Sequence, residues 1–204
     1  YAELPHDTVR DFTHIANMVN FPLLLVSHPS LPVKNVKELI ALARAQPGHI
    51  TYSHPGAGNS GHLAGELFNS LAKVKIQNIP YKGTAPAVIA VVSGEAHLTY
   101  SSIPSILPHV RAGRVRALGV GNAQRIPSLP EFPTIAEAGL PGYEAYAWGG
   151  MIGPANMPPA IVQPNGPTPL ADSLKEHENL IDGGDDRMQA AIRARRATAD
   201  ATGL

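Results

Sequence analysis

The stretch Ser53–Lys73, SHPGAGNSGHLAGELFNSLAK, joins a glycine-rich loop to an amphipathic helix. The polar and small residues of the loop are Gly56, Gly58, Asn59, Ser60 and Gly61. The helix is expected to bury one apolar face, made of Leu63, Ala64, Leu67, Phe68 and Leu71. Residues 49–52, before the loop, are typical of a short strand. A strand, a glycine loop and a helix in this order present backbone N–H groups at the positive end of the helix. Such groups suit an anion, for example a carboxylate or a phosphate.

The glycine loop lacks both nucleotide-binding patterns, G-x-x-x-x-G-K-[ST] and G-x-G-x-x-G, so a nucleotide is not the expected anion. The same glycines are compatible with a turn that only closes a strand–helix packing unit. We expect Asn59 or Ser60 either to cap the helix or to hydrogen-bond a ligand. His62, in the first helical turn, is interpreted as a capping or packing residue.

Composition narrows the classes of function. The chain has 204 residues, a formal net charge of zero and 16% charged residues, which gives no electrostatic footprint for nucleic acid or an anionic membrane. It contains no cysteine, so disulfides, thiolate nucleophiles and cysteine-ligated metals are excluded. The nine histidines form no H-x-x-x-H pair, so we expect no metal and no other cofactor. No apolar run is long enough to span a bilayer.

Residues 21–121 alternate between expected strands and helices joined by short links, which predicts a parallel, open α/β sheet. The expected strands are 21–26, 49–52, 75–79, 97–101 and 115–120. In such sheets ligands bind beyond the carboxyl ends of the strands, beside helix N-termini. Three polar segments follow expected strands: the glycine loop, the Tyr81-Lys82-Gly83-Thr84 turn and Ser101-Ser102. We expect them to converge.

Beyond residue 121 the pattern weakens. Residues 126–134 are rich in proline and are typical of a stiff crossing segment. Thr134 and Glu137 have the spacing of a capping box, and residues 143–152 are expected to form a strand that carries Trp148. In residues 163–204 only 188–196 has a helical pattern, and this divergent tail is expected not to pack.

Several motifs resemble one known family in the same order and at natural spacing. They are GHLAGELF (61–68), IPYKGTAPAV (79–88) and SGEAHLTYSSIPSILPHVRAGRVRALGV (93–120). Arg125, Pro130, Pro133-Thr134, Glu137-Ala138-Gly139, Pro141-Gly142 and Trp148 continue the match. Over residues 1–162 the chain resembles the Bug-type, TctC-like solute-binding receptors of tripartite tricarboxylate transporters.

The resemblance implies an α/β, periplasmic-binding-protein-like fold of type II, a two-lobed Venus flytrap. It implies a periplasmic, monomeric receptor, not an enzyme, that captures a di- or tricarboxylate, an amino acid or an aromatic acid for a membrane permease. By this resemblance residues 1–20 are a remnant of the first lobe and 21–121 the complete second lobe with one parallel sheet. Residues 122–162 are the crossover and part of the first lobe, and 163–204 are the tail.

The resemblance also implies which residues bind the ligand. Donors at the helix start would come from Gly58, Asn59 and Ser60, and the Tyr81-Lys82-Gly83-Thr84 turn would line the same cleft. Ser101 and Ser102 stand where many relatives carry an acidic residue followed by Asn, and this change should alter which ligand is preferred. Trp148 would approach from the other lobe or belong to the core.

The chain departs from the family at both ends. A signal peptide and the first βαβ unit with its P-x-A-G-G loop do not occur, and QPNGPTPL follows Val162 where a helix is usual. We therefore expect a gene fragment, with a changed reading frame near Gln163 as a hypothesis. One alternative is a truncated member that no longer binds ligand tightly. A less favoured alternative is a small α/β hydrolase-type enzyme, although the nucleophile motif G-x-S-x-G is absent.

Overall fold

A computed structural model describes residues 7, 10–158 and 162. The expectations for residues 1–6 and for the tail 163–204 lie outside the described residues. The chain divides into two compact units, one of which is Asn20–Trp148, called here the 20–148 unit. The described residues 7, 10–19, 149–158 and 162 belong to the other.

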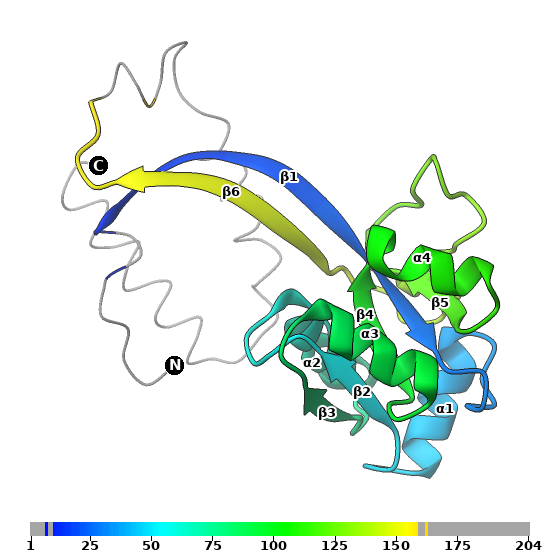
Figure 1. Cartoon of the computed structure of the whole chain (residues 1–204). Helices are drawn as coiled ribbons and strands as arrows, with labels where there is room; N and C mark the ends of the chain where they lie inside the picture. The colour runs from blue at the N-terminus through cyan, green and yellow to red at the C-terminus, as the bar shows by residue number, and fades with distance from the viewer. Residues whose placement is uncertain (1–6, 8–9, 159–161, 163–204) are drawn as a thin grey trace. The chain divides into compact units, whose positions relative to one another are not determined.

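The elements follow the expected alternation (Figure 1). The strands are β1 (Phe12–Ser27), β2 (Thr51–His54), β3 (Gln77–Pro80), β4 (Leu98–Ser102), β5 (Arg116–Val120) and β6 (Tyr146–Pro154). The helices are α1 (Val36–Ala45), α2 (Ser60–Ala72), α3 (Thr84–Ser93), α4 (Ile103–Arg111) and α5 (Ile135–Ala138). Among the described residues, no helix combines the length and the apolar character needed to cross a membrane.

The sheet has the strand order β3-β2-β4-β1-β5, with β6 also paired to β1. β2 runs parallel to β3 and to β4, as predicted. β1 runs antiparallel to both β4 and β5, so the sheet is mixed, and the expectation of a wholly parallel sheet is wrong for this strand. The alternation of strands and helices does not reveal to which end of the sheet a connection returns. Residues 28–50 leave the end of β1 and start β2 at the same end of the sheet. β2 therefore runs in the opposite direction to β1.

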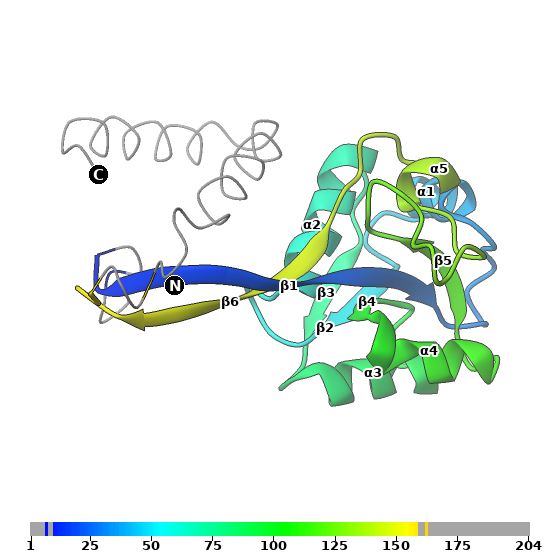
Figure 2. The same cartoon turned by 90° about the horizontal axis from the view of Figure 1, so that it is seen from above.

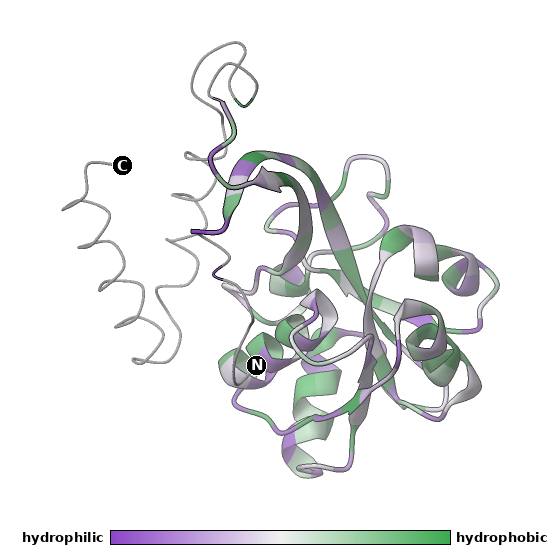
Figure 3. Ribbon diagram, turned by 60° about the vertical axis from the view of Figure 1, so that its left-hand side comes forward, coloured by the Kyte–Doolittle hydropathy of each residue, from purple (hydrophilic) through white to green (hydrophobic). Residues whose placement is uncertain are grey.

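Helices cover both faces of the sheet in the 20–148 unit: α1, α2 and α5 lie on one side, and α3 and α4 on the other (Figure 2). β1 serves both layers, because Leu23 and Leu25 belong to the core beneath α1 and α2, and Leu24 and Val26 to the core beneath α3 and α4. A strand buried on both faces reads as a continuous apolar run, which explains LLLV at residues 23–26, whereas Phe21 is 42% exposed. The hydrophobic segments lie mainly on helices and strands (Figure 3).

The 20–148 unit continues past residue 121 because α5 and the segment after it pack on the sheet. Ile135, Leu140 and Tyr143 are buried members of the same core as α1 and α2. Val120 donates its amide to the Pro133 carbonyl at 2.9 Å, which ties the end of the proline-rich segment to β5.

The predicted buried face of α2 is partly wrong. Leu63 and Leu71 are 58% and 42% exposed, and the face against the sheet is formed by Gly61, Ala64, Gly65, Phe68 and Ala72. Small residues allow the helix to approach closely, since a Cβ atom at Gly65 would overlap the ring of Tyr52. A search for large apolar side chains at helical spacing misses a face built from glycine and alanine.

Candidate ligand-binding site

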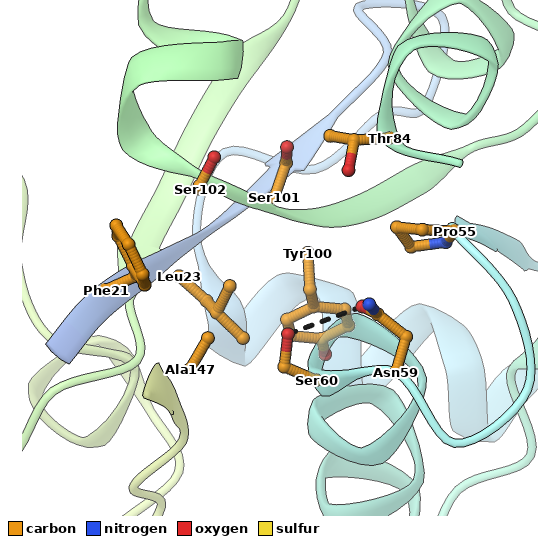
Figure 4. A pocket seen from close by; sticks show the side chains of 10 residues that line it. All are labelled: Phe21, Leu23, Pro55, Asn59, Ser60, Thr84, Tyr100, Ser101, Ser102 and Ala147. Carbon is orange, nitrogen blue, oxygen red and sulfur yellow. Dashed lines mark hydrogen bonds between the residues drawn. The ribbon is translucent and has the colours of Figure 1, made fainter. Parts of the chain in front are cut away.

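A pocket with a volume of about 220 Å³ lies within the 20–148 unit (Figure 4). It is lined by Phe21, Leu23, Pro55, Asn59, Ser60, Thr84, Tyr100, Ser101, Ser102 and Ala147. Five of these residues were predicted at the site, and they come from three separate segments of the chain. The expected convergence of the glycine loop, the 81–84 turn and the Ser101-Ser102 pair therefore occurs, and each segment contributes at least one lining residue.

Three helices begin at this pocket. Ser60 is the first residue of α2, Thr84 is the first residue of α3, and Ser102 is the N-cap of α4. The first turn of a helix carries N–H groups that the helix itself does not satisfy, and its dipole adds partial positive charge there. The pocket thus combines backbone donors from three directions, an arrangement that stabilises an anion without any basic side chain.

Two of the three helix starts lack a side-chain cap. Gly83, the N-cap of α3, has no side chain, and Ser102 makes no cap hydrogen bond to α4. The Ser102 hydroxyl instead pairs with the Ser105 hydroxyl at 2.8 Å. Pro86 and Pro104 have no N–H, so the first-turn donors left at these two starts are the amides of Thr84 and Ala85 in α3 and of Ile103 and Ser105 in α4, and no capping side chain occupies them.

Two backbone amides near the start of α2 already donate hydrogen bonds to side chains of the same segment. The Asn59 side chain caps the helix by accepting from the Gly61 amide at 3.0 Å, and the Gly58 amide donates to Nδ1 of His62 at 3.2 Å. The helical ladder supplies no acceptor for the amide of Ser60. Of the predicted trio, Asn59 and Ser60 line the pocket, and the Gly58 amide is engaged within the loop.

Aromatic rings of three residues, Tyr52, His54 and His62, pack against one another at the two ends of the glycine loop. The rings of His54 and His62 stack with centroids 4.6 Å apart, and Tyr52 lies 5.7 Å from His54. The Tyr52 hydroxyl donates to Glu66 at 2.7 Å, and burial raises the pKa of Tyr52 above its ordinary value. The interpretation of His62 as a capping or packing residue is confirmed by these contacts.

The turn at residues 81–84 contributes one side chain to the pocket. Thr84 lines it, whereas the Tyr81 hydroxyl donates to Glu95 at 2.7 Å. Partial burial and the Glu95 carboxylate raise the pKa of Tyr81 to about 12. Lys82 is exposed, and the Gly83 amide donates to the Pro55 carbonyl at 3.1 Å, which ties the turn to the glycine loop. The contacts of Tyr81 and Gly83 thus tie the turn before Thr84 to Glu95 and to Pro55.

Trp148 is not one of the residues that line the pocket, and its side chain is 54% exposed. The apolar wall is made of residues that sequence reasoning did not assign to the site: Phe21, Leu23, Pro55, Tyr100 and Ala147. Pro55 and Tyr100 lie in or beside the predicted segments, so the sequence could have indicated them as lining residues. Phe21, Leu23 and Ala147 carry no local signal, since their place depends on strand pairing.

The lining residues carry no formal charge. Tyr100 is buried, and burial raises the pKa of its hydroxyl well above the ordinary value, so it stays neutral. Ser101 is 4% exposed, and its hydroxyl has no hydrogen-bond partner among the described residues. In the described part of the chain no group of three or more His, Asp and Glu side chains could hold a metal ion.

Comparison with known proteins shows which family the chain resembles. The model of the tripartite tricarboxylate transporter family receptors (TctC) matches residues 1–168. A UPF0065 protein from the tcbD-tcbE intergenic region of Pseudomonas sp. (strain P51) is 37% identical over 164 residues, covering 80% of this chain and 49% of that protein. BugT of Bordetella pertussis is 32% identical over 159 residues, covering 78% and 49%. The chain spans about half the length of the curated relatives it matches.

Solved structures agree with the sequence relatives. Rpa4515 of R. palustris with adipate matches with a TM-score of 0.74 and 40% identity, covering 80% of this chain and 55% of that one. MatC from Rhodopseudomonas palustris with bound malate matches with a TM-score of 0.71 and 32% identity, covering 78% and 54%. The predicted α/β, periplasmic-binding-protein-like fold class is therefore confirmed.

Proposed function

Since the chain belongs to the tripartite tricarboxylate transporter receptor family, the Bug-type TctC-like receptors, we propose that it is an extracytoplasmic solute-binding receptor for a small carboxylate. The observation that carries this proposal is the convergence of three helix N-termini on one pocket lined by uncharged side chains. The adipate and malate bound to two similar structures support the same class of ligand.

The physical basis is the supply of neutral donors to a charged oxygen. Hydrogen bonds to a charged group contribute about 1.5–3 kcal/mol each. Two or three such bonds, from the first turns of α3 and α4 and from Ser60, sum to about 3–9 kcal/mol, a range that includes the roughly 4 kcal/mol of a millimolar dissociation constant. The apolar wall formed by Phe21, Leu23 and Ala147 suits the carbon skeleton of the ligand.

The role is capture and delivery without chemistry. The family consists of receptors, and we place this chain with them as a non-enzymatic, monomeric component that works in the periplasm and hands its ligand to a membrane permease. Within that organisation we assign to the second lobe residues 21–121 together with the segment up to residue 148, whose Ile135, Leu140 and Tyr143 belong to the same core.

Calorimetry on the full chain tests the proposal with matched probes. Adipate and malate are titrated alongside adipamide, which has the shape of adipate and no charge. We expect saturable binding of at least one carboxylate and none of adipamide. No binding of any carboxylate by a chain that still unfolds cooperatively would favour the truncated, non-binding alternative. Turnover of an ester would favour the enzyme.

A further inference from the structure

Resting on the proposed function, we propose that Ser101 is a specificity residue: its buried hydroxyl bonds a ligand oxygen in surroundings without negative charge, so the pocket takes carboxylates that lack an ammonium group and rejects amino acids. This narrows the ligand class that the fold alone permits.

Ser101 occupies an unusual position for a polar side chain. It lies on β4 opposite Leu24 of β1, inside the sheet, and is 4% exposed. Its hydroxyl has no hydrogen-bond partner among the described residues, although the residue lines the pocket. In the view of Figure 4 it lies between Ser102 and Thr84, the residues at the starts of α4 and α3. A buried hydroxyl without a partner costs stability, and a ligand oxygen in the pocket would remove that cost.

The electrostatics around Ser101 disfavour a cation. None of the lining residues is acidic; Glu144, three residues from the lining residue Ala147, is not one of them, and two other carboxylates near the lining segments, Glu66 and Glu95, accept hydrogen bonds from tyrosines. Glu66 accepts from the Tyr52 hydroxyl at 2.7 Å, and Glu95 accepts from the Tyr81 hydroxyl at 2.7 Å. Three helix N-termini add partial positive charge. An ammonium group here would be desolvated without a counter-charge, which is costly.

An oxygen of a carboxylate, a hydroxyl or a carbonyl group is favoured where an ammonium group is not. Each accepts from the Ser101 hydroxyl and from the helix amides, and none brings positive charge. The pocket should therefore distinguish two ligands of equal shape when one carries an oxygen or a hydrogen and the other a protonated amine. Shape contributes little to this choice, so charge decides it.

Calorimetry at pH 7 on the full chain separates these ligands. Succinate, L-malate and L-aspartate share one carbon skeleton, and adipate and 2-aminoadipate form a second matched pair for a longer site. We expect the amine-free member of whichever set binds to bind at least about tenfold more tightly than its amino counterpart. Equal or tighter binding of the amino compound would overturn the inference and leave the proposed function standing.

Ser101→Ala tests the residue itself, with Ser27→Ala as the matched control. Ser27 is also fully buried on the sheet with an unpartnered hydroxyl, but it does not line the pocket. Ser101→Ala should weaken binding of the preferred carboxylate about tenfold, and Ser27→Ala should leave it unchanged, with thermal unfolding confirming that both variants fold. Unchanged binding by a folded Ser101→Ala variant would refute the role. Failure of every carboxylate to bind the unaltered chain would overturn the proposed function and this inference together.

Discussion

The N-termini of α1 and α5 are capped by side-chain hydrogen bonds, whereas those of α3 and α4 have no side-chain cap and are called open here. The Asn35 side chain accepts from the Glu38 amide at 2.9 Å at the start of α1. Thr134 and Glu137 form a full capping box at the start of α5. No side-chain cap is made at α3 or α4, whose starts meet the pocket. A missing cap forgoes about 0.5–2 kcal/mol of stability, so open helix starts mark where a ligand can take the place of the cap.

The sharpest way to break this contrast is to close an open start. Ser102 has φ −61° and ψ 142°, the extended backbone of an N-cap, so Ser102→Asp should cap α4 with its own carboxylate. We expect unfolding stability to rise by about 0.5–1 kcal/mol and carboxylate affinity to fall roughly 100-fold, since a like charge then occupies the pocket.

Ser102→Asn is the matched control, because it caps without a charge. It should lower affinity less than Ser102→Asp does. Denaturant titration and calorimetry on the two variants measure both quantities. A variant that gains the cap and keeps full carboxylate affinity would show that the start of α4 is not used by the ligand.

A second variant removes one backbone donor from α2. Ser60 is the first helical residue, where proline is tolerated, and Asn59 before it has φ −71° and ψ 157°, which a following proline accepts. Ser60→Pro should therefore fold normally and bind a carboxylate about 10- to 100-fold more weakly.

Ser60→Ala keeps the amide and removes only the hydroxyl, which lies 3.3 Å from the Asn59 side-chain oxygen. If calorimetry gives equal losses for the proline and alanine variants, the hydroxyl is the group that matters and the amide argument for α2 fails.

The capped starts should affect stability alone. Thr134 is buried, and Thr134→Ala removes the hydroxyl that accepts from the Glu137 amide at 3.0 Å, so the free energy of unfolding should fall by about 1–2 kcal/mol. Ser102→Ala removes no cap hydrogen bond, and its stability should change by less than about 0.5 kcal/mol. Urea unfolding compares them, and equal losses would remove the distinction between capped and open starts.

The smallest effect concerns the charge in the α5 capping box. The Thr134 amide, and then Arg125, lower the pKa of Glu137 below its ordinary value of 4.5. A lowered folded-state pKa gives stability that is present above the unfolded pKa and is lost as the pH falls through the folded one. Glu137→Gln should thus be less stable than the parent chain near neutral pH and nearly equal well below pH 4.5. A stability difference that stays constant across this range would contradict the assignment.

Local sequence signals predicted the capped start of α5 and the arrangement of the pocket segments. Thr134 and Glu137 act within one turn of the chain, so their spacing alone is enough. Polar residues at the ends of β2, β3 and β4 lie at one pocket, because parallel strands bring their carboxyl ends to the same edge of the sheet. The binding role of these residues stays a prediction.

Features that depend on distant partners could not be predicted. The direction of β1 depends on where its connection returns, and the apolar wall depends on strand pairing that brings Phe21 and Ala147 to one pocket. The buried face of α2 depends on Tyr52 beneath Gly65, a contact that makes a glycine more suitable than a leucine. The missing side-chain cap of α4 could not be predicted from the sequence either. Ser102 is a favourable N-cap residue, but its hydroxyl here bonds Ser105.

Amide chemical shifts during a carboxylate titration test the central claim most directly. With adipate or malate added to the uniformly ¹⁵N-labelled chain, we predict saturable shifts for the first-turn amides of α2, α3 and α4, led by Ser60, Thr84 and Ile103. The corresponding amides Val36 of α1 and Ile135 of α5 should not move. Saturable shifts that leave Ser60, Thr84 and Ile103 unmoved would contradict the account.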